Sequence, residues 1–118
     1  MNIWLDDQRK APEGWLHLHN IEEVEQLIES VHDLKDFHIN IMSFDFHLSH
    51  PKDGIDVMVY LAKLCSKSNT SRFWPKTVRY HSNDPKGVEV MRDFVISFEK
   101  EILPKHKNIK GKAFNKLF

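Results

Sequence analysis

The chain contains one cysteine, four glycines and no long uninterrupted apolar run. A lone cysteine, Cys65, excludes an intramolecular disulfide framework and a cysteine-rich zinc site. A membrane-spanning helix needs about 20 consecutive apolar residues. The N-terminus carries Asp6 and Asp7, where a signal peptide would be apolar. These absences predict a cytoplasmic protein that does not associate with a membrane.

The 118 residues show no internal repeat, no low-complexity tract and no linker rich in Gly or Ser. This continuity favours one domain, which we expect over residues 1–104, with residues 105–118 as a basic C-terminal segment of the same domain. The segment has no acidic residue, and its lysines are Lys105, Lys107, Lys110, Lys112 and Lys116. Such a run is either a solvated face or a contact for a nucleic acid or a protein partner.

The net charge of zero conceals an uneven distribution along the chain. Residues 1–60 carry 12 acidic and 4 basic side chains, whereas residues 61–118 carry 5 acidic and 13 basic ones. Whether these charges are also separated in space depends on how the fold interleaves the two halves.

Short apolar runs alternate along the chain with segments of helical periodicity. The predicted strands cover residues 2–5, 15–19, 39–45 and 77–81, of which the last two are expected to be buried. The predicted helices follow an N-cap at Asn20, cover residues 55–65, and run from Asp84-Pro85 through Ile102 to a break at Pro104. Strands that alternate with helices favour parallel pairing and right-handed crossovers. The predicted fold class is therefore α/β, with a three-layer, doubly wound sheet.

Polar side chains stand at the carboxyl ends of three predicted strands, where ligands bind in open parallel sheets. These residues are Asp6 and Asp7, then Asp45 and His47, then His81, Ser82 and Asn83. If the three strands are neighbours, several carboxylates and a hydroxyl share one pocket.

Carboxylates held close together repel one another, at about 4 kcal/mol per pair for a 4 Å separation and an effective dielectric near 20. Such a cluster must bind a cation, hold a proton or lie beside an arginine or lysine. Oxygen ligands without cysteine indicate Mg²⁺ or Mn²⁺, whose remaining ligands are characteristically water and phosphate oxygens. The residues alone leave a structural reading open, in which Asp6 and Asp7 cap a loop and pair with Arg9 while Asp45 caps the next turn.

Four short blocks of the sequence resemble the cyclic-phosphate-processing receiver-like domains, a family related to response-regulator receivers. The blocks are Leu5-Asp6-Asp7-Gln8-Arg9 with Pro12, Gly14 and Trp15; Ser43-Phe44-Asp45-Phe46-His47-Leu48; Gly54-Ile55-Asp56-Val57; and His81-Ser82-Asn83-Asp84-Pro85-Lys86-Gly87. They occur in the family's order and span residues 1 to about 95.

The resemblance implies a receiver-like or flavodoxin-like fold in which Asp6, Asp7 and Asp45 are metal ligands. Asp45 matches the receiver's phosphoacceptor aspartate, and Ser82 matches the hydroxyl residue that contacts phosphate. The family usually has Asp-His-Asp where this chain has Asp45-Phe46-His47, so an imidazole replaces one carboxylate. Residues 105–118 offer no clear strand before a lysine, which predicts a reduced or irregular final strand and disfavours ordinary phosphorelay signalling.

Two functions follow as expectations. The first is a metal-dependent enzyme that hydrolyses or transfers phosphoesters, including cyclic phosphates on nucleotides or RNA ends, as the family name implies. In it Arg9, Ser82 and Asn83 hold phosphate, and His81 or His47 moves a proton. In a variant of the same mechanism, Asp45 forms a covalent aspartyl-phosphate. The planar guanidinium of Arg9 suits either a grip on phosphate or a bond back to Asp6 or Asp7. The second function is a non-catalytic receiver-like scaffold that binds a protein or a nucleic acid.

Overall fold

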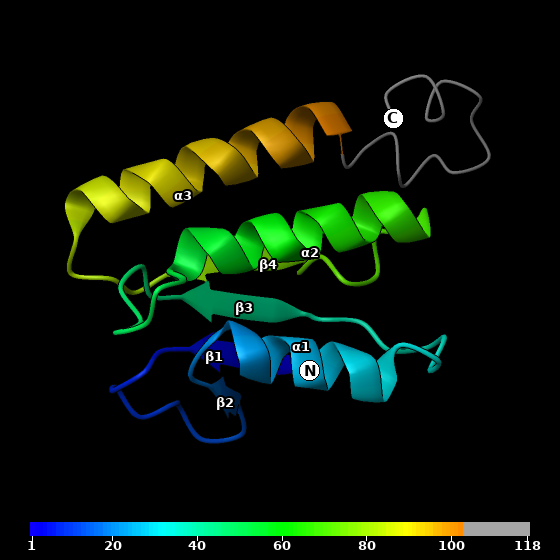
Figure 1. Ribbon diagram of the computed structural model, residues 1–118, viewed down its shortest axis with the longest axis horizontal. Coiled ribbons are helices and arrows are strands. Elements are labelled where there is room, and N and C mark those ends of the chain that lie inside the picture. The colour runs from blue at the N-terminus through cyan, green and yellow to red at the C-terminus, as the bar shows by residue number, and fades with distance from the viewer. Residues whose placement is uncertain (103–118) are drawn as a thin grey trace.

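The computed structural model describes residues 1–102. Its elements are β1 (Asn2–Leu5), β2 (Leu16–Leu18), α1 (Ile21–Val31), β3 (Ile41–Phe44), α2 (Gly54–Ser68), β4 (Thr77–Tyr80), α3 (Pro85–Ser97) and a π-helical turn over Phe98–Ile102. The strands form one parallel sheet in the order β2-β1-β3-β4 (Figure 1). The predicted α/β, parallel, receiver-like fold is confirmed, whereas the basic segment and the break at Pro104 lie outside the described residues.

The layering of the described residues differs from the predicted three layers. The chain passes from β1 to β2 without a helix, through residues 6–15. The β2–α1–β3 and β3–α2–β4 connections then cross the sheet in the same direction. Right-handed crossovers that move in one direction place their helices on the same face, and α2 in turn contacts α1 and α3. In residues 1–102 the helices therefore cover one face of the sheet.

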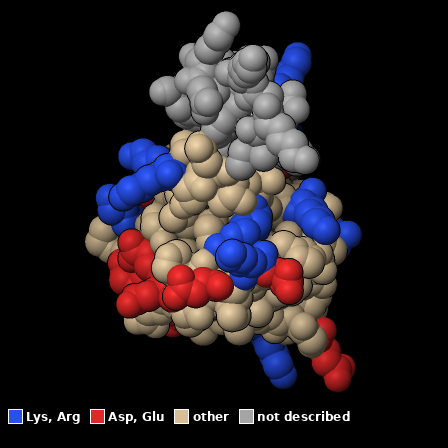
Figure 2. All heavy atoms as spheres, turned by 90° about the vertical axis from the view of Figure 1, so that its right-hand side faces the viewer, with Lys and Arg blue, Asp and Glu red and all other residues tan. Residues whose placement is uncertain are grey.

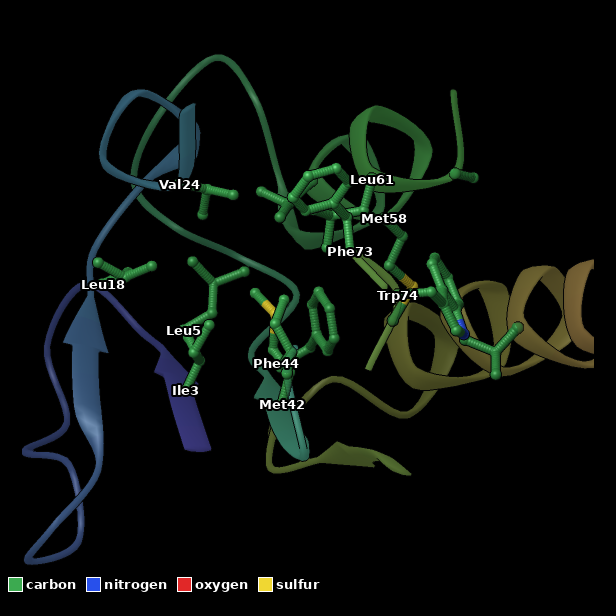
Figure 3. Packing of buried hydrophobic residues seen from close by; sticks show 14 of the residues in the cluster. Ile3, Leu5, Leu18, Val24, Met42, Phe44, Met58, Leu61, Phe73 and Trp74 are labelled. Atoms are coloured by element: carbon green, nitrogen blue, oxygen red, sulfur yellow. The ribbon is translucent and has the colours of Figure 1, made fainter. Parts of the chain in front are cut away.

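The covered face of the sheet forms the core (Figure 3). Alternate residues of the two central strands point into it, since Ile3, Leu5, Met42 and Phe44 are each at most 1% exposed. The helices meet them with a set of buried apolar side chains: Val24 and Ile28 from α1, Met58 and Leu61 from α2, and Met91 and Val95 from α3. This packing holds β1 and β3 side by side, and their carboxyl ends carry the predicted acidic residues.

Among the described strands, β4 lies at an edge of the sheet. The prediction that this strand is buried is wrong. Thr77 and Arg79 are exposed, and Val78 and Tyr80 are half-buried. Among residues 1–102, β4 pairs only with β3. Its position still brings His81, the residue after the strand, to the same edge as Asp45.

Local capping sets where the helices begin. The Asn20 side chain accepts a hydrogen bond from the Glu23 amide at the start of α1, as the sequence predicts. Asp53 and Asp56 form a capping box at the start of α2, and Asp84 accepts from the Lys86 and Gly87 amides at the start of α3. Each of these helices follows a strand, so all three described helices begin at the edge of the sheet where the strands end.

Acidic and basic side chains are interspersed at the amino edge of the sheet, where Lys and Arg lie near the middle and at both sides of the face, next to groups of Asp and Glu (Figure 2). The imbalance between the two halves of the sequence is therefore partly cancelled in space at this end. None of the described helices has both the length and the apolar character needed to cross a bilayer.

Candidate metal centre

The carboxyl ends of β1 and β3 bring three acidic side chains together. Leu5 pairs with Phe44 across the two strands, so the next residues along the chain, Asp6 and Asp45, lie side by side. One carboxylate oxygen from each of Asp6, Asp7 and Asp45 lies within 4.8 Å of the others. The structure thus assembles the three carboxylates that the sequence singles out, and three hard oxygen donors at this spacing suit a divalent cation such as Mg²⁺.

Asp6 is the buried member of this cluster, with 1% of its surface exposed. Its Oδ1 accepts hydrogen bonds of 2.8 Å from the backbone amides of Gln8 and Arg9. Burial raises the pKa of Asp6, but these two hydrogen bonds and the contact with His81 lower it, and the net shift is downward. Asp6 is therefore held as a carboxylate at neutral pH.

Asp45 is half-buried and has less support. Its Oδ1 accepts a hydrogen bond of 2.9 Å from the Phe46 amide. Burial raises the pKa of Asp45, the negative charge of Asp6 raises it further, and a hydrogen bond with the Ser82 side chain only partly opposes this. Without a cation the negative charges of Asp6 and Asp45 repel each other, and a bound divalent cation would relieve this repulsion.

Arg9 does not relieve that repulsion. Its backbone amide contacts Asp6, but its guanidinium donates to the carbonyl oxygen of His81 at 2.6 Å. Among the described residues, no ion pair joins the Arg9 side chain to Asp6 or Asp7. The structural reading of this cluster therefore holds for the loop cap at Asp6 and fails for the pairing with Arg9.

His47 is not a member of the acidic cluster. Its Nε2 lies 2.6 Å from Oδ2 of Asp84, and its side chain is 65% exposed. Asp84 also caps α3, and hydrogen bonds, first from the Gly87 amide and then from His47, lower the pKa of its carboxyl group. The imidazole that replaces a family carboxylate thus pairs with a helix cap and is not brought into the group of three carboxylates.

An open pocket of about 520 Å³ joins these groups. Its walls contain His47, a predicted catalytic residue, and all of the predicted metal and phosphate residues: Asp6, Asp7, Arg9, Asp45, Ser82 and Asn83. Ser82 accepts a hydrogen bond of 3.1 Å from the Asp84 amide, which orients its hydroxyl. The pocket is therefore lined by the three carboxylates, the guanidinium of Arg9 and the hydroxyl of Ser82.

His81 lies beneath the pocket and is not among its lining residues. Its Nε2 is 3.0 Å from Oδ2 of Asp6, and its Nδ1 is 2.7 Å from the hydroxyl of Ser43. The ring stacks on Trp4 with a centroid separation of 3.7 Å and an interplanar angle of 9°. Burial lowers the pKa of His81, although the neighbouring Asp6 opposes this shift.

Sequence reasoning missed the role of Ser43, a buried polar residue on β3. The available signal was a single hydroxyl in the apolar run 39–45. Such a residue needs a hydrogen-bond partner when it is buried. The sequence alone could not show that this partner comes from the end of another strand.

An acidic cluster at the carboxyl edge of a parallel α/β sheet defines a receiver-like domain. A family model described as the cyclic-phosphate processing receiver domain matches residues 1–97, and the chain belongs to this family. A search of curated proteins and a search of solved structures each found no match.

Proposed function

We propose that this protein is a divalent-metal-dependent enzyme that hydrolyses or transfers phosphoesters, with cyclic phosphates of nucleotides or RNA ends as its substrate class. The observation that carries this proposal is the meeting of three carboxylate oxygens within 4.8 Å in a pocket that Arg9 and Ser82 also line. Membership of the cyclic-phosphate processing receiver family supports the choice of substrate.

Asp6, Asp7 and Asp45 would hold the cation, for which Mg²⁺ and Mn²⁺ are the proposed identities because all the donors are carboxylate oxygens. A bound divalent cation supplies positive charge that polarises a phosphoryl oxygen and acidifies a water molecule. Asp6 is preorganised for this role by its two amide hydrogen bonds. Asp45 gains most from the cation, because its charge is otherwise opposed by Asp6.

Arg9, Ser82 and Asn83 would bind the phosphate group. All three line the same pocket as the carboxylates. The guanidinium of Arg9 is exposed and makes one hydrogen bond to the carbonyl of His81, which leaves other N–H donors for phosphate oxygens. The Asn83 side chain is exposed at the rim, and Ser82 is oriented by the Asp84 amide. These donors fix the phosphate over the three carboxylates.

His47 or His81 would move a proton between the substrate and water. The position of His47 suits this role, because its side chain is exposed on the pocket wall and is hydrogen-bonded to Asp84. The carboxylate of Asp84 orients the ring through this hydrogen bond. His81 is less accessible, with 10% of its side chain exposed.

The direct test is an assay on 2′,3′-cyclic nucleotides and on RNA that ends in a cyclic phosphate, with Mg²⁺ or Mn²⁺ added. We expect metal-dependent opening of the cyclic phosphate, reduced at least about 100-fold by Asp7→Ala because one ligand is lost. Asp93→Ala, which removes an exposed carboxylate on α3, should retain wild-type activity. No turnover on these substrates with either ion would contradict the proposal.

A second candidate is a non-catalytic scaffold that binds a protein or a nucleic acid. The observation that favours it is His47, which replaces a family carboxylate and bonds to Asp84. The proposed contact segment, residues 105–118, lies outside the described residues. Metal titration separates the two candidates, since Mg²⁺ should shift the amide resonances near Asp6 and Asp45 only if the acidic cluster binds it.

A further inference from the structure

Three residues from three strands form a buried chain of hydrogen bonds beneath the pocket. Ser43 lies within β3, Asp6 follows β1, and His81 follows β4. The distances are 2.7 Å from the Ser43 Oγ to Nδ1 of His81 and 3.0 Å from Nε2 of His81 to Oδ2 of Asp6. The side chains of His81 and Asp6 are 10% and 1% exposed, and Ser43 is 3% exposed. Water is therefore largely excluded from this chain.

The donors and acceptors of the chain fit one tautomer of His81. The Asp6 carboxylate can only accept, so the imidazole presents N–H at Nε2. A neutral ring then has a lone pair at Nδ1, and the Ser43 hydroxyl donates to it. Burial of the ring, whose side chain is 10% exposed, favours its neutral form. Both ring nitrogens are thus occupied within the protein.

Two further contacts hold the His81 ring in place. Its face stacks on Trp4 at 3.7 Å, and its backbone carbonyl accepts the guanidinium of Arg9 at 2.6 Å. Trp4 is itself fixed by a hydrogen bond of 3.1 Å from its indole N–H to the Arg9 carbonyl. The ring therefore has little freedom to turn toward a substrate.

The same residue types form the catalytic triad of serine hydrolases, but this arrangement does not act as one. A nucleophilic serine must reach the substrate, whereas Ser43 is 3% exposed and does not line the pocket. Of the three hydrogen-bonded residues, Asp6 is the one that lines the pocket. These hydrogen bonds therefore act on the Asp6 carboxylate, and Ser43 takes no part in a chemical step.

We propose that Ser43 and His81 are positioning residues that orient the Asp6 carboxylate for a divalent cation. This inference rests on the proposed function, because it takes the acidic cluster to be a metal site. The Ser43 hydroxyl donates to Nδ1 of the Nε2–H tautomer that Asp6 requires, and His81 donates to Oδ2 of Asp6 while the Gln8 and Arg9 amides hold Oδ1. Partners of this kind, which contact a ligand but not the metal, typically contribute 10- to 100-fold in metal affinity. Proton transfer then falls to His47.

The tautomer is tested first, on the metal-free full chain. Two-bond ¹H–¹⁵N correlations of the imidazoles distinguish the Nε2–H tautomer from the Nδ1–H tautomer, and a His81→Gln sample assigns the His81 signals. We expect the Nε2–H tautomer in the wild-type protein. In Ser43→Ala, Nδ1 of His81 loses its hydrogen-bond donor. Its ¹⁵N resonance should therefore move toward that of an imidazole nitrogen that accepts no hydrogen bond. A wild-type Nδ1–H tautomer would overturn the proposal.

Metal affinity is tested next, by titration with Mn²⁺ alone and with Mg²⁺ alone. We expect Ser43→Ala to raise the Kd for Mn²⁺ about tenfold, and Ser43→Thr, which retains the hydroxyl, to restore affinity to within about twofold of wild type. Ser30→Ala is the matched control, since it removes an exposed hydroxyl that bonds to the Leu27 carbonyl. Thermal unfolding of each variant shows whether it is folded.

The outcomes separate this inference from the function on which it rests. If the wild-type protein binds neither ion, the proposed function fails and the positioning role fails with it. If the wild type binds Mn²⁺ and Ser43→Ala binds it equally well, only the positioning role is refuted. Weaker binding in Ser43→Ala that Ser43→Thr repairs supports both.

Discussion

The charged side chains at the two edges of the sheet differ in the partners that they have within the protein. At the carboxyl edge, Asp6, Asp7 and Asp45 crowd together, and no lysine or arginine of the described residues forms an ion pair with them. At the amino edge, the guanidinium of Arg72 donates to the backbone carbonyls of His32 and Leu34 and lies 4.1 Å from the ring of Phe73.

The amino edge also has a pocket, of about 720 Å³, whose lining includes Lys35, Arg72, Trp74 and Lys76 (its end of the molecule faces the viewer in Figure 2). Beyond the end of α1, where the Leu34 carbonyl already accepts from the Phe37 amide, Arg72 donates further hydrogen bonds to the carbonyls of His32 and Leu34. Its charge therefore stabilises the fold. At the other edge Asp45 lies beside the negative charge of Asp6, and this contrast supports the proposal of a metal site at the carboxyl edge.

The largest expected effect comes from a close backbone contact at the carboxyl edge. A Cβ on Gly54 would lie 2.1 Å from the carbonyl oxygen of Asp45, where only backbone movement can make room. Gly54→Ala should reduce the free energy of unfolding by about 3 kcal/mol, because the first turn of α2 and Asp45 cannot both keep their positions. It should also weaken Mn²⁺ binding. Urea unfolding and Mn²⁺ titration measure the two effects, and a variant as stable as wild type would show that the contact is not rigid.

At the amino edge, Arg72→Ala should cost stability without affecting the metal site. The variant loses hydrogen bonds to the His32 and Leu34 carbonyls and the contact with Phe73, which together are worth about 2 kcal/mol. Arg92→Ala is the control, since Arg92 is exposed and lies 5.8 Å from the Tyr80 ring; it should cost less than about 1 kcal/mol. A change in Mn²⁺ affinity in Arg72→Ala would mean that the two edges are coupled.

The two ends of α1 allow a smaller test of the same contrast, because Asn20 caps the end at the carboxyl edge. Asn20→Ala removes the hydrogen bond of 3.0 Å from the Glu23 amide and should lower the free energy of unfolding by about 1 kcal/mol. Asn20→Asp keeps an accepting oxygen and should be close to wild type. Chemical denaturation compares the two variants, and equal losses in both would assign the effect to something other than the cap.

The smallest expected effect is a gain in stability. The pKa of Asp45 is raised in the folded protein by burial and by Asp6, so between the ordinary aspartate pKa and this raised value the folded state holds a proton that the unfolded chain has released. The stability of the metal-free protein therefore falls as pH rises through that interval. Asp45→Asn should remove this loss and raise stability at neutral pH by less than about 1 kcal/mol, because water screens the exposed part of the carboxyl group.

Thermal unfolding in a chelator, at several pH values, measures this gain. Addition of Mg²⁺ should reverse the order, since the wild type gains a bound ion that Asp45→Asn does not. A variant that is less stable than wild type in the chelator at neutral pH would contradict the electrostatic conflict between Asp6 and Asp45.

Much of the fold could be predicted from local signals. Asn20 with Glu23 indicates a helix start, Asp84-Pro85 indicates another, and the apolar runs before Asp6 and Asp45 indicate strands. The edge position of β4 could not be predicted, because a short apolar run has the same pattern in a central and in an edge strand. The layering also escaped prediction, since it follows from strand order and from a β1–β2 connection without a helix.

The sequence by itself determined which residues stand at the ends of the strands, because periodicity and capping depend on neighbours a few positions away. Only the tertiary structure decided which of them meet. It brings Asp6, Asp7 and Asp45 together, turns His47 onto Asp84, and joins Ser43 to His81 over a separation of 38 residues. Such contacts depend on how β1, β3 and β4 pair and on how the core holds them in register, and neither is encoded in the spacing of residues along the chain.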